Sequence, residues 1–342
     1  MNQDAEIIRR LVAAHDPAAG LIAADAHADL QGHATLERIL ATPTAKTGRA
    51  GRAGRRWWPY AILPSVVWAA IAVTFVLLVV RTVDSGSPAL AATPSPLAYH
   101  LPEKAPTGRE LLLQLAAVAA HEPVRTRPDE AYAYVRTAGW YLDTQARGNQ
   151  ANSKVVASVR ESWIAANGFD RWITRRVPGN GSHVSVTAIG PQTGQDAGAG
   201  PRRLRLSTIP AVIAHQLDIG HPRTIGPVER FVSLTDLALN QPISPRAQSA
   251  ILRVLAGSPG LIDSGKVTDR AGRPGVAVSL DSAYSGLPTR YTLIFNPDTS
   301  SLLGEEQTLL GNPGKLHVPP KSVIAYTAFL ASDYVASPTA RP

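Results

Sequence analysis

The segment HQLDIGHP holds the densest group of ligand-type side chains in the C-terminal two thirds of the chain: His215, Asp218 and His221. Imidazole and carboxylate groups at short spacing are the donors of zinc sites. On a helix, positions 215 and 218 share a face, whereas position 221 points elsewhere. The spacing therefore favours histidines whose hydrogen bonds are satisfied within the protein, and we expect no metal here.

A second group of hard ligands, Asp25, His27, Asp29 and His33, lies near the N-terminus. The first three of these residues are spaced i, i+2, i+4, so they do not share one face of a helix. We interpret them as a solvated polar surface.

Four acidic residues could suggest a pair of carboxylates for general acid–base catalysis: Asp281, Asp298, Glu305 and Glu306. Glu305 and Glu306 are adjacent in a predicted strand, so their side chains must point to opposite faces. We expect all four to be solvated charges at a sheet edge.

Whole classes of chemistry are excluded by composition and by missing motifs. The 342 residues include no Cys, which removes disulfides, thiolate metal sites and thiol nucleophiles. The chain also lacks the GxSxG, GxGxxG, GxxxxGK[ST] and HExxH patterns. We therefore predict no catalytic residue, no cofactor and no metal.

Aromatic residues on three adjacent predicted strands form the best candidate ligand surface. They are Trp140, Trp163 and Trp172, with Tyr132 and Tyr134 on the first strand. Such a set forms either ordinary core or the lining of an apolar cavity. Core is the simpler interpretation, and a cavity would suit a lipid-like ligand.

One uncharged segment predicts a membrane span. Residues 59–80 contain no charge over 22 positions, which is enough helix to cross a bilayer. We expect a transmembrane helix over 57–81, which also carries Trp68 and Phe75. Trp57, Trp58 and Tyr60 suit the headgroup interface.

The basic run GRAGRAGRR sets the orientation. Arg49, Arg52, Arg55 and Arg56 precede the span, and basic residues stay on the cytoplasmic side. We expect a plasma-membrane protein with a single retained signal anchor, a cytoplasmic N-terminus and an extracytoplasmic C-terminal domain. The position of these arginines beside the span favours this role over binding of nucleic acid.

Residues 1–56 show short amphipathic helical patterns, and they are too few to bury a core of their own. A partner protein, the membrane surface or partial disorder must complete this cytoplasmic helical segment. Beyond the span, residues 82–106 are rich in Pro, Ser and Ala and predict a tether, and 337–342 predict a disordered tail.

Between them, 107–336 predicts one exported domain. Thr107 and Glu110 have capping-box spacing ahead of a helix to about residue 120. Ser244 with Pro245 opens another helix that stops at Gly257, and Ser233 or Thr235 is a candidate cap for a short turn. Period-two alternation predicts strands within these ranges: 131–143, 153–165, 168–177, 183–189, 261–269, 275–283, 289–297, 301–310 and 322–335. The fold class is α+β: a curved antiparallel sheet, or half-barrel, of seven to nine strands with helices on one face.

Two segments, GKVTDRAGRPGVAV and LIFNPDTSSLLGEE, carry a resemblance to an uncharacterised family of actinobacterial single-pass membrane proteins. The resemblance spans 107–335. It implies an exported fold similar to the half-barrel of periplasmic lipoprotein carriers and of the periplasmic regulator that senses envelope stress beside an anti-sigma factor. The chain departs from zinc anti-sigma domains, whose His and Cys ligands it cannot supply.

These observations favour a membrane-anchored binding or regulatory protein. Its exported domain would sense an envelope component, such as a lipid-like molecule, or a partner protein, while the cytoplasmic segment reports to an intracellular protein. A membrane-anchored scaffold fits the same features, and an exported cell-wall hydrolase is the enzyme alternative.

Overall fold

The computed structural model describes residues 93–123, 132–147, 150–166, 170–176, 183–189, 203–283 and 285–342. The expected span 57–81, its interface residues and the arginines before it lie outside these ranges, as do Asp25, His27, Asp29 and His33. Within the described ranges, no helix has the length and hydrophobicity needed to cross a bilayer.

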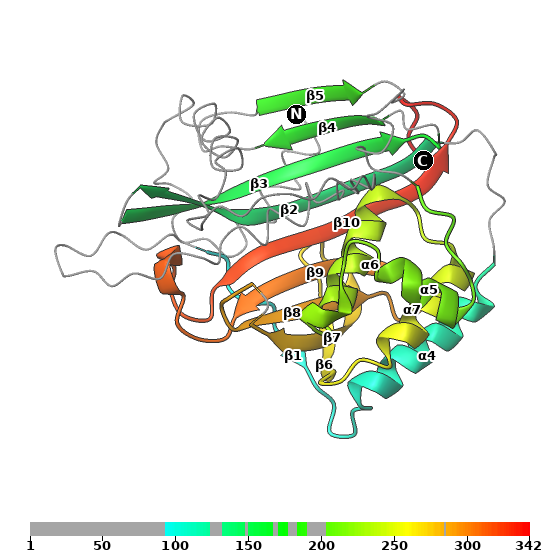
Figure 1. Ribbon diagram of the computed structural model, residues 1–342, viewed down its shortest axis with the longest axis horizontal. Helices are drawn as coiled ribbons and strands as arrows, with labels where there is room; N and C mark the ends of the chain where they lie inside the picture. The colour runs from blue at the N-terminus through cyan, green and yellow to red at the C-terminus, as the bar shows by residue number, and fades with distance from the viewer. Residues whose placement is uncertain are drawn as a thin grey trace, which may run out of the picture.

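The domain is α+β and is built on one antiparallel sheet (Figure 1). The strand order is β1-β6-β7-β8-β9-β10-β2-β3-β4-β5, so every pair except β1–β6 and β10–β2 joins strands that are consecutive in sequence. The strands are β1 Tyr99–His100, β2 Tyr132–Arg147, β3 Gln150–Ile164, β4 Asp170–Arg176, β5 His183–Ile189, β6 Ile262–Thr268, β7 Pro274–Ser282, β8 Thr289–Phe295, β9 Leu302–Leu309 and β10 Val323–Val335. The predicted antiparallel sheet is confirmed, with two-residue β1 as an unexpected addition at one edge.

Four α-helices are described: α4 Gly108–His121, α5 Pro210–Leu217, α6 Glu229–Asn240 and α7 Pro245–Leu255. The capping box of Thr107 and Glu110 and the Ser244 cap are both present. The proposed caps Ser233 and Thr235 are wrong, because both lie buried inside α6, which begins earlier at Glu229.

All four helices pack on one face of the sheet, here called the helix face. Leu112, Leu115, Ile251 and Leu255 of α4 and α7 are completely or almost completely buried against β7 and β8 side chains such as Leu293. Close packing of this kind leaves side chains, rather than a ligand, between helices and sheet.

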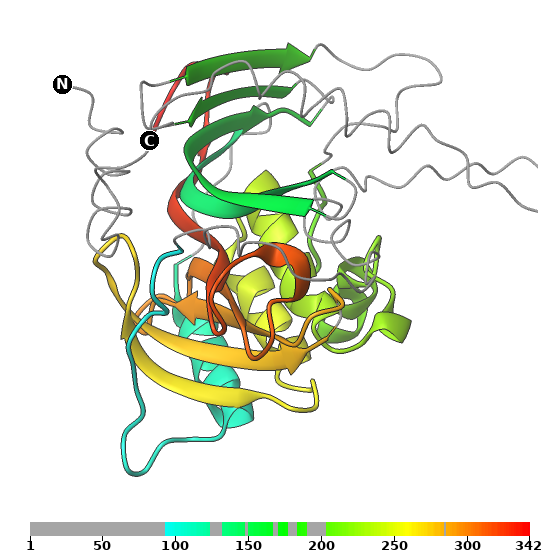
Figure 2. The ribbon, with the colours of Figure 1, turned by 90° about the vertical axis from the view of Figure 1, so that its left-hand side faces the viewer.

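The other face is concave, and the sheet curls around it (Figure 2). Tyr99 of β1 reaches Glu306 of β9 with a hydroxyl-to-carboxylate distance of 3.0 Å. In a flat sheet these strands would lie four spacings, or about 19 Å, apart. The concave face therefore brings residues from distant strands together.

Candidate binding site between residues 93–100 and the sheet

Residues 93–100, here called the strap, cross the concave face. The sequence predicted a tether in this region, whereas the structure builds the strap into the fold. Tyr99 and His100 pair with Val267 and Lys266 of β6. Leu97 packs against the cluster of buried apolar side chains on the concave face. The segment that leads toward the expected membrane span is therefore part of the domain.

A buried ion pair holds the strap. The side chains of Glu306 and Arg270 are 1% and 3% exposed, and their carboxylate-to-guanidinium distance is 2.7 Å. Glu306 also accepts hydrogen bonds from the Leu97 amide at 3.3 Å and from the Tyr99 hydroxyl. Arg270 donates to the Ser95 carbonyl at 2.7 Å. Each charged group thus binds both its partner and the strap.

The β6–β7 turn positions Arg270. Asp269 accepts hydrogen bonds from the backbone amides of Ala271 and Arg273, and Gly272 adopts a φ of +81°. Arg273 binds Asp269 with its side chain and donates to the carbonyls of Leu303 and Phe329. The turn is consequently fixed against β9 and β10, with Arg270 directed at Glu306. The two sequence segments that carry the family resemblance meet at this ion pair.

Aromatic side chains enclose the pair and remain neutral. The Arg270 guanidinium lies 5.0 Å from the ring centre of Tyr326 and 5.8 Å from that of Trp140. Burial raises the pKa of both Tyr99 and Tyr326 above the usual range, and for Tyr99 the Glu306 charge adds to this. The hydroxyls therefore stay protonated: that of Tyr99 donates to Glu306, and that of Tyr326 accepts a hydrogen bond from the Arg270 backbone amide.

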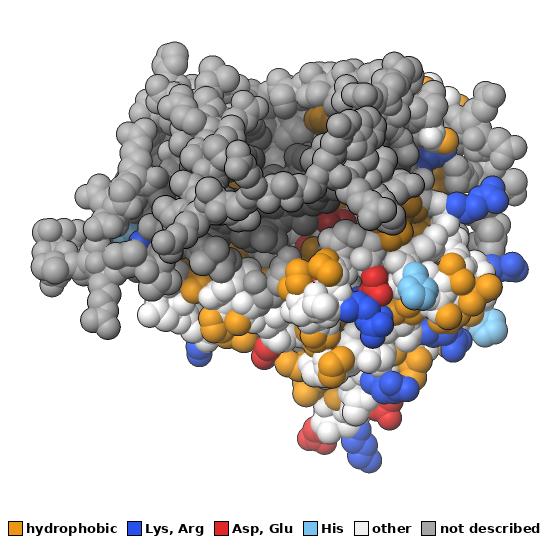
Figure 3. Space-filling model, viewed as in Figure 1, with side chains coloured by type: hydrophobic (Ala, Val, Ile, Leu, Met, Phe, Trp, Pro, Cys, Tyr) orange, Lys and Arg blue, Asp and Glu red, His pale blue; other side chains and the backbone are white. Residues whose placement is uncertain are grey.

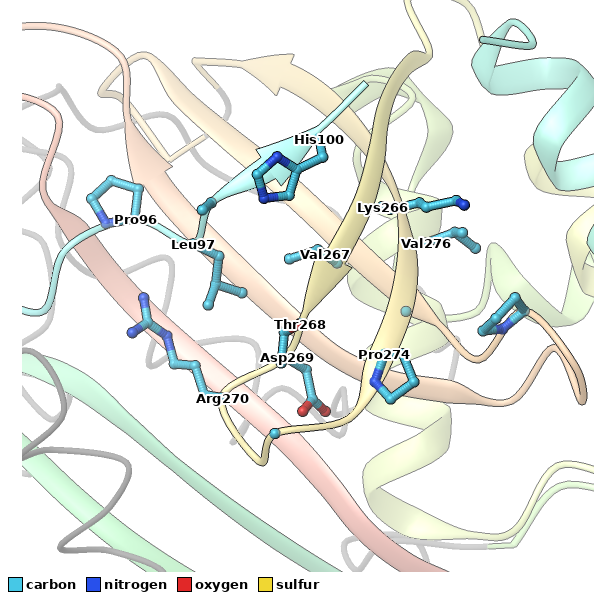
Figure 4. Close-up of a pocket in the computed structure, with 14 residues that line it drawn as sticks. Pro96, Leu97, His100, Lys266, Val267, Thr268, Asp269, Arg270, Pro274 and Val276 are labelled. Atoms are coloured by element: carbon cyan, nitrogen blue, oxygen red, sulfur yellow. The ribbon is translucent and has the colours of Figure 1, made fainter. Parts of the chain in front are cut away.

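A cavity of about 790 Å³ lies between the strap and the β6–β7 hairpin (Figure 4). The strap contributes Pro96, Leu97 and His100, and the hairpin contributes Lys266 and Arg270 among others. Arg270 Nε on the cavity wall and Trp140 Nε1 beside that arginine are among the buried donors of the described chain that have no hydrogen-bond partner. Buried donors normally find an acceptor, so these two could receive one from a bound molecule.

The helix face carries a separate polar cluster around His221. Its ring nitrogens lie 3.1 Å from the Glu229 carboxylate and 3.3 Å from that of Asp236. Burial lowers the pKa of His221, but the hydrogen bonds to Asp236 and Glu229 outweigh this and raise it to about 9. His215 is exposed on α5 and does not join His221. No group of three ligand-type side chains suited to a metal occurs among the described residues.

The two adjacent glutamates do point to opposite faces, as their spacing predicts. Glu306 lies on the concave face and Glu305 on the helix face, where burial raises the pKa of Glu305 to about 7. The expectation that all four acids are solvated edge charges is wrong for Glu306, which is buried, and for Glu305, which is partly buried on the interior strand β9. Asp281 forms a half-exposed pair with Arg290, and Asp298 is exposed.

The predicted aromatic surface is split by the strand register. Tyr134 pairs with Trp163 and Trp140 with Ala157, which places these aromatic residues and Tyr132 on the concave face. Trp172 pairs with Ser162, so it lies on the opposite face. Trp140 and Trp163 belong to different clusters and are 3% and 0% exposed, which makes them core.

An exposed apolar patch covers α5 and the turns beside it (Figure 3). Its members are Ile209, Val212, Ile219 and Ile225, which are 44–60% exposed. Patches of this kind are typical of protein interaction surfaces.

Comparisons with family models, curated proteins and solved structures find no match to this chain. The site therefore rests on geometry. Sequence patterning identified neither Tyr99 nor Arg270, because Tyr99 lies in Pro-rich sequence and Arg270 in a turn. Only Glu306 could have indicated the site from the sequence, because it is a glutamate at a strand position that faces the concave side of the sheet.

Proposed function

We propose that this chain is a single-pass, membrane-anchored binding and regulatory protein with an extracytoplasmic half-barrel domain. Its domain recognises an envelope component or partner at the cavity beside the strap. The observation that carries this proposal is the shared wall: the strap forms one side of the cavity and also leads toward the expected membrane anchor.

The ligand chemistry follows from the cavity lining. Leu97, Val267 and Val276 offer apolar contacts, while the exposed side chains of Lys266 and His100 at its edge offer hydrogen-bonding groups. A molecule with an apolar part and an anionic or carbonyl acceptor suits this combination. A lipid-like ligand belongs here rather than between sheet and helices, where packed side chains fill the space.

Signalling requires that the ligand favour one of two states of the protein. A molecule in the cavity contacts the strap and the hairpin together, so it changes how firmly the strap is held. A lone membrane helix reports such a change through its association with other copies or with a cytoplasmic partner of residues 1–56.

A reversible disulfide between the strap and β6 tests this proposal. The chain has no Cys, so His100→Cys with Lys266→Cys creates the only thiol pair. These residues are directly paired across β1 and β6, at a separation that suits a disulfide. Energy transfer between donor- and acceptor-labelled N-termini is measured in membranes, before and after reduction, with His100→Cys alone as the control.

A regulatory strap predicts that oxidation changes the energy transfer or the set of proteins that co-purify with residues 1–56, and that reduction restores both. Identical results in the locked and reduced states would exclude regulation through the strap and favour a passive scaffold.

A further inference from the structure

The last six residues, 337–342, lie against β2, β3 and β4 in the structure, although the sequence predicted a disordered tail. The C-terminus lies close to the ends of these strands and of β10 (Figure 1). Ala340 packs beside the buried ring of Trp163. The tail has no helical or strand structure of its own, so side chains of the sheet must hold it.

The sheet binds the tail as a protein binds an extended peptide. Trp163 Nε1 donates to the Ala340 carbonyl at 2.7 Å, and Arg171 donates to the Pro338 carbonyl at 2.6 Å. Glu161 accepts two hydrogen bonds from Arg341, at 2.5 and 3.0 Å. The Arg341 guanidinium also lies 5.5 Å from the Trp163 ring centre. Backbone carbonyls and one arginine side chain are thus recognised together.

The pocket for the arginine persists without the tail. Glu161 is 2% exposed, yet it also binds the Tyr134 hydroxyl at 2.7 Å and Arg175 at 2.9 Å. Burial raises the pKa of Glu161, but its hydrogen bonds to Arg341, Arg175 and Tyr134 outweigh this and lower it to about 2. Without the tail, the carboxylate would still have Arg175 and Tyr134 as hydrogen-bond partners.

The outer side of the tail is open to solvent. The Arg341 side chain is half exposed, and Ala336, Thr339 and Pro342 are exposed. We infer that Glu161, Trp163 and Arg171 form a peptide-binding groove for an extended, arginine-containing segment of a partner protein, and that the chain's own Pro-Thr-Ala-Arg sequence occupies it in competition. This groove is separate from the strap cavity and does not depend on the function proposed there.

Arginine is the side chain that the groove selects. Its planar fork makes two parallel bonds to one carboxylate and stacks on an aromatic ring, whereas lysine offers a single point charge. A bound partner must displace a segment that is covalently attached and so present at high effective concentration.

The test uses the full-length chain in nanodiscs and a fluorescent peptide, ASPTARP, equal to residues 336–342. Arg341→Ala removes the contacts of the tail's arginine with Glu161 and Trp163 and so weakens the hold on the tail without altering the groove walls. We expect saturable peptide binding to the Arg341→Ala chain that is at least tenfold tighter than to the unaltered chain. Arginine-to-lysine substitution in the peptide should weaken binding about tenfold, and arginine-to-alanine should abolish it.

Two groove variants make the result specific. Arg171→Met removes the contact to the Pro338 carbonyl, and Glu161→Gln removes the arginine's charge partner; each is combined with Arg341→Ala and should reduce binding. Glu161→Gln removes a buried charge and can therefore prevent folding. If it does, the Arg171→Met variant decides the test.

Absence of peptide binding to the Arg341→Ala chain, or binding that Arg171→Met leaves unchanged, would overturn the groove. Association of the unaltered chain into dimers that Arg341→Ala abolishes would instead assign the groove to the tail of a second copy, which would overturn a separate partner.

Discussion

Two carboxylates on the concave face, Glu161 and Glu306, have the same kind of surroundings. Each accepts a hydrogen bond from a tyrosine hydroxyl and pairs with arginine, and each holds a segment near one end of the domain. A buried carboxylate is stable only when it is fully partnered, so removal of one partner costs more than the pair itself contributes. Glu306 therefore holds the strap, and Glu161 holds the C-terminal tail.

Glu306→Gln keeps the shape of the side chain and leaves the buried Arg270 guanidinium without a counter-charge. We expect the free energy of unfolding to fall by about 3–5 kcal/mol, the usual cost of breaking a buried pair. Denaturant unfolding of the full-length chain in nanodiscs measures this change. Asp281→Asn, which breaks the half-exposed pair with Arg290, is the matched control and should cost no more than about 1 kcal/mol. Equal effects of the two substitutions would contradict the account of Glu306.

His221 predicts a pH dependence with a definite sign. Its pKa is raised from 6.5 to about 9 in the folded protein, so the folded state holds its proton more tightly. The resulting stabilisation is complete below about pH 6.5 and is lost as the pH rises through 9, up to about 3 kcal/mol in total. His221→Gln should flatten the melting temperature between pH 6.5 and 9. His215→Gln, at an exposed position, is the control and should leave the pH dependence of the melting temperature unchanged. The same pH dependence in His221→Gln as in the unaltered chain would refute this prediction.

At the scale of elements, periodicity and caps predicted most of the domain. The helix after Thr107, the helix after Ser244 and every strand from β2 to β10 occur where alternation or capping placed them. Helix α5 was missed because Ile209, its N-cap, makes no side-chain capping bond. The strap was missed because only two of its residues pair with another strand, and a Pro-rich segment carries no alternation. Both segments are fixed by tertiary contacts: α5 places Ile213 and Leu217 in the main buried cluster, and Leu97 of the strap packs against the cluster on the concave face.

Gly265 is the position through which β1 can be released selectively. Its φ is +83°, and a Cβ there would lie 2.3 Å from the His100 carbonyl oxygen of the strap. Gly265→Ala should therefore displace β1 and raise hydrogen exchange of the amides of residues 97–100 by at least tenfold. Gly272→Ala imposes similar backbone strain at φ +81° with no atom within 4 Å. Equal exchange at 97–100 in both variants would show that strain, not the clash, determines the result.

For the whole molecule, titrating groups on both faces combine into one stability profile. Glu305, with its pKa raised from 4.5 to about 7, loses stabilisation as the pH rises through that range, and His221 follows between 6.5 and 9. Glu161, with its pKa lowered to about 2, loses stabilisation as the pH falls below 4.5. We expect a maximum in melting temperature near about pH 4.5–5. A maximum above pH 7 would mean that other groups dominate, and Glu305→Gln should flatten the profile between 4.5 and 7.

The absence of Cys also allows membrane topology to be tested directly. Ala41→Cys in the expected cytoplasmic segment and Glu103→Cys, which is exposed beyond the strap, are expressed separately. A membrane-impermeant maleimide should label only Glu103→Cys in intact cells and both variants after permeabilisation. Labelling of Ala41→Cys in intact cells would contradict the predicted orientation.

The shortness of β1 has a mechanical consequence. On the proposed topology, a load that pulls the domain away from the membrane would place tension on the strap. A two-residue strand with one ion pair should resist pulling far less than strands of 13–16 residues such as β2, β3 and β10. The strap therefore detaches first, while the sheet remains intact. Release of residues 93–106 adds up to about 50 Å of extended chain. We therefore expect the strap to be the part of the described domain that yields first under such a load and re-forms when the load is removed.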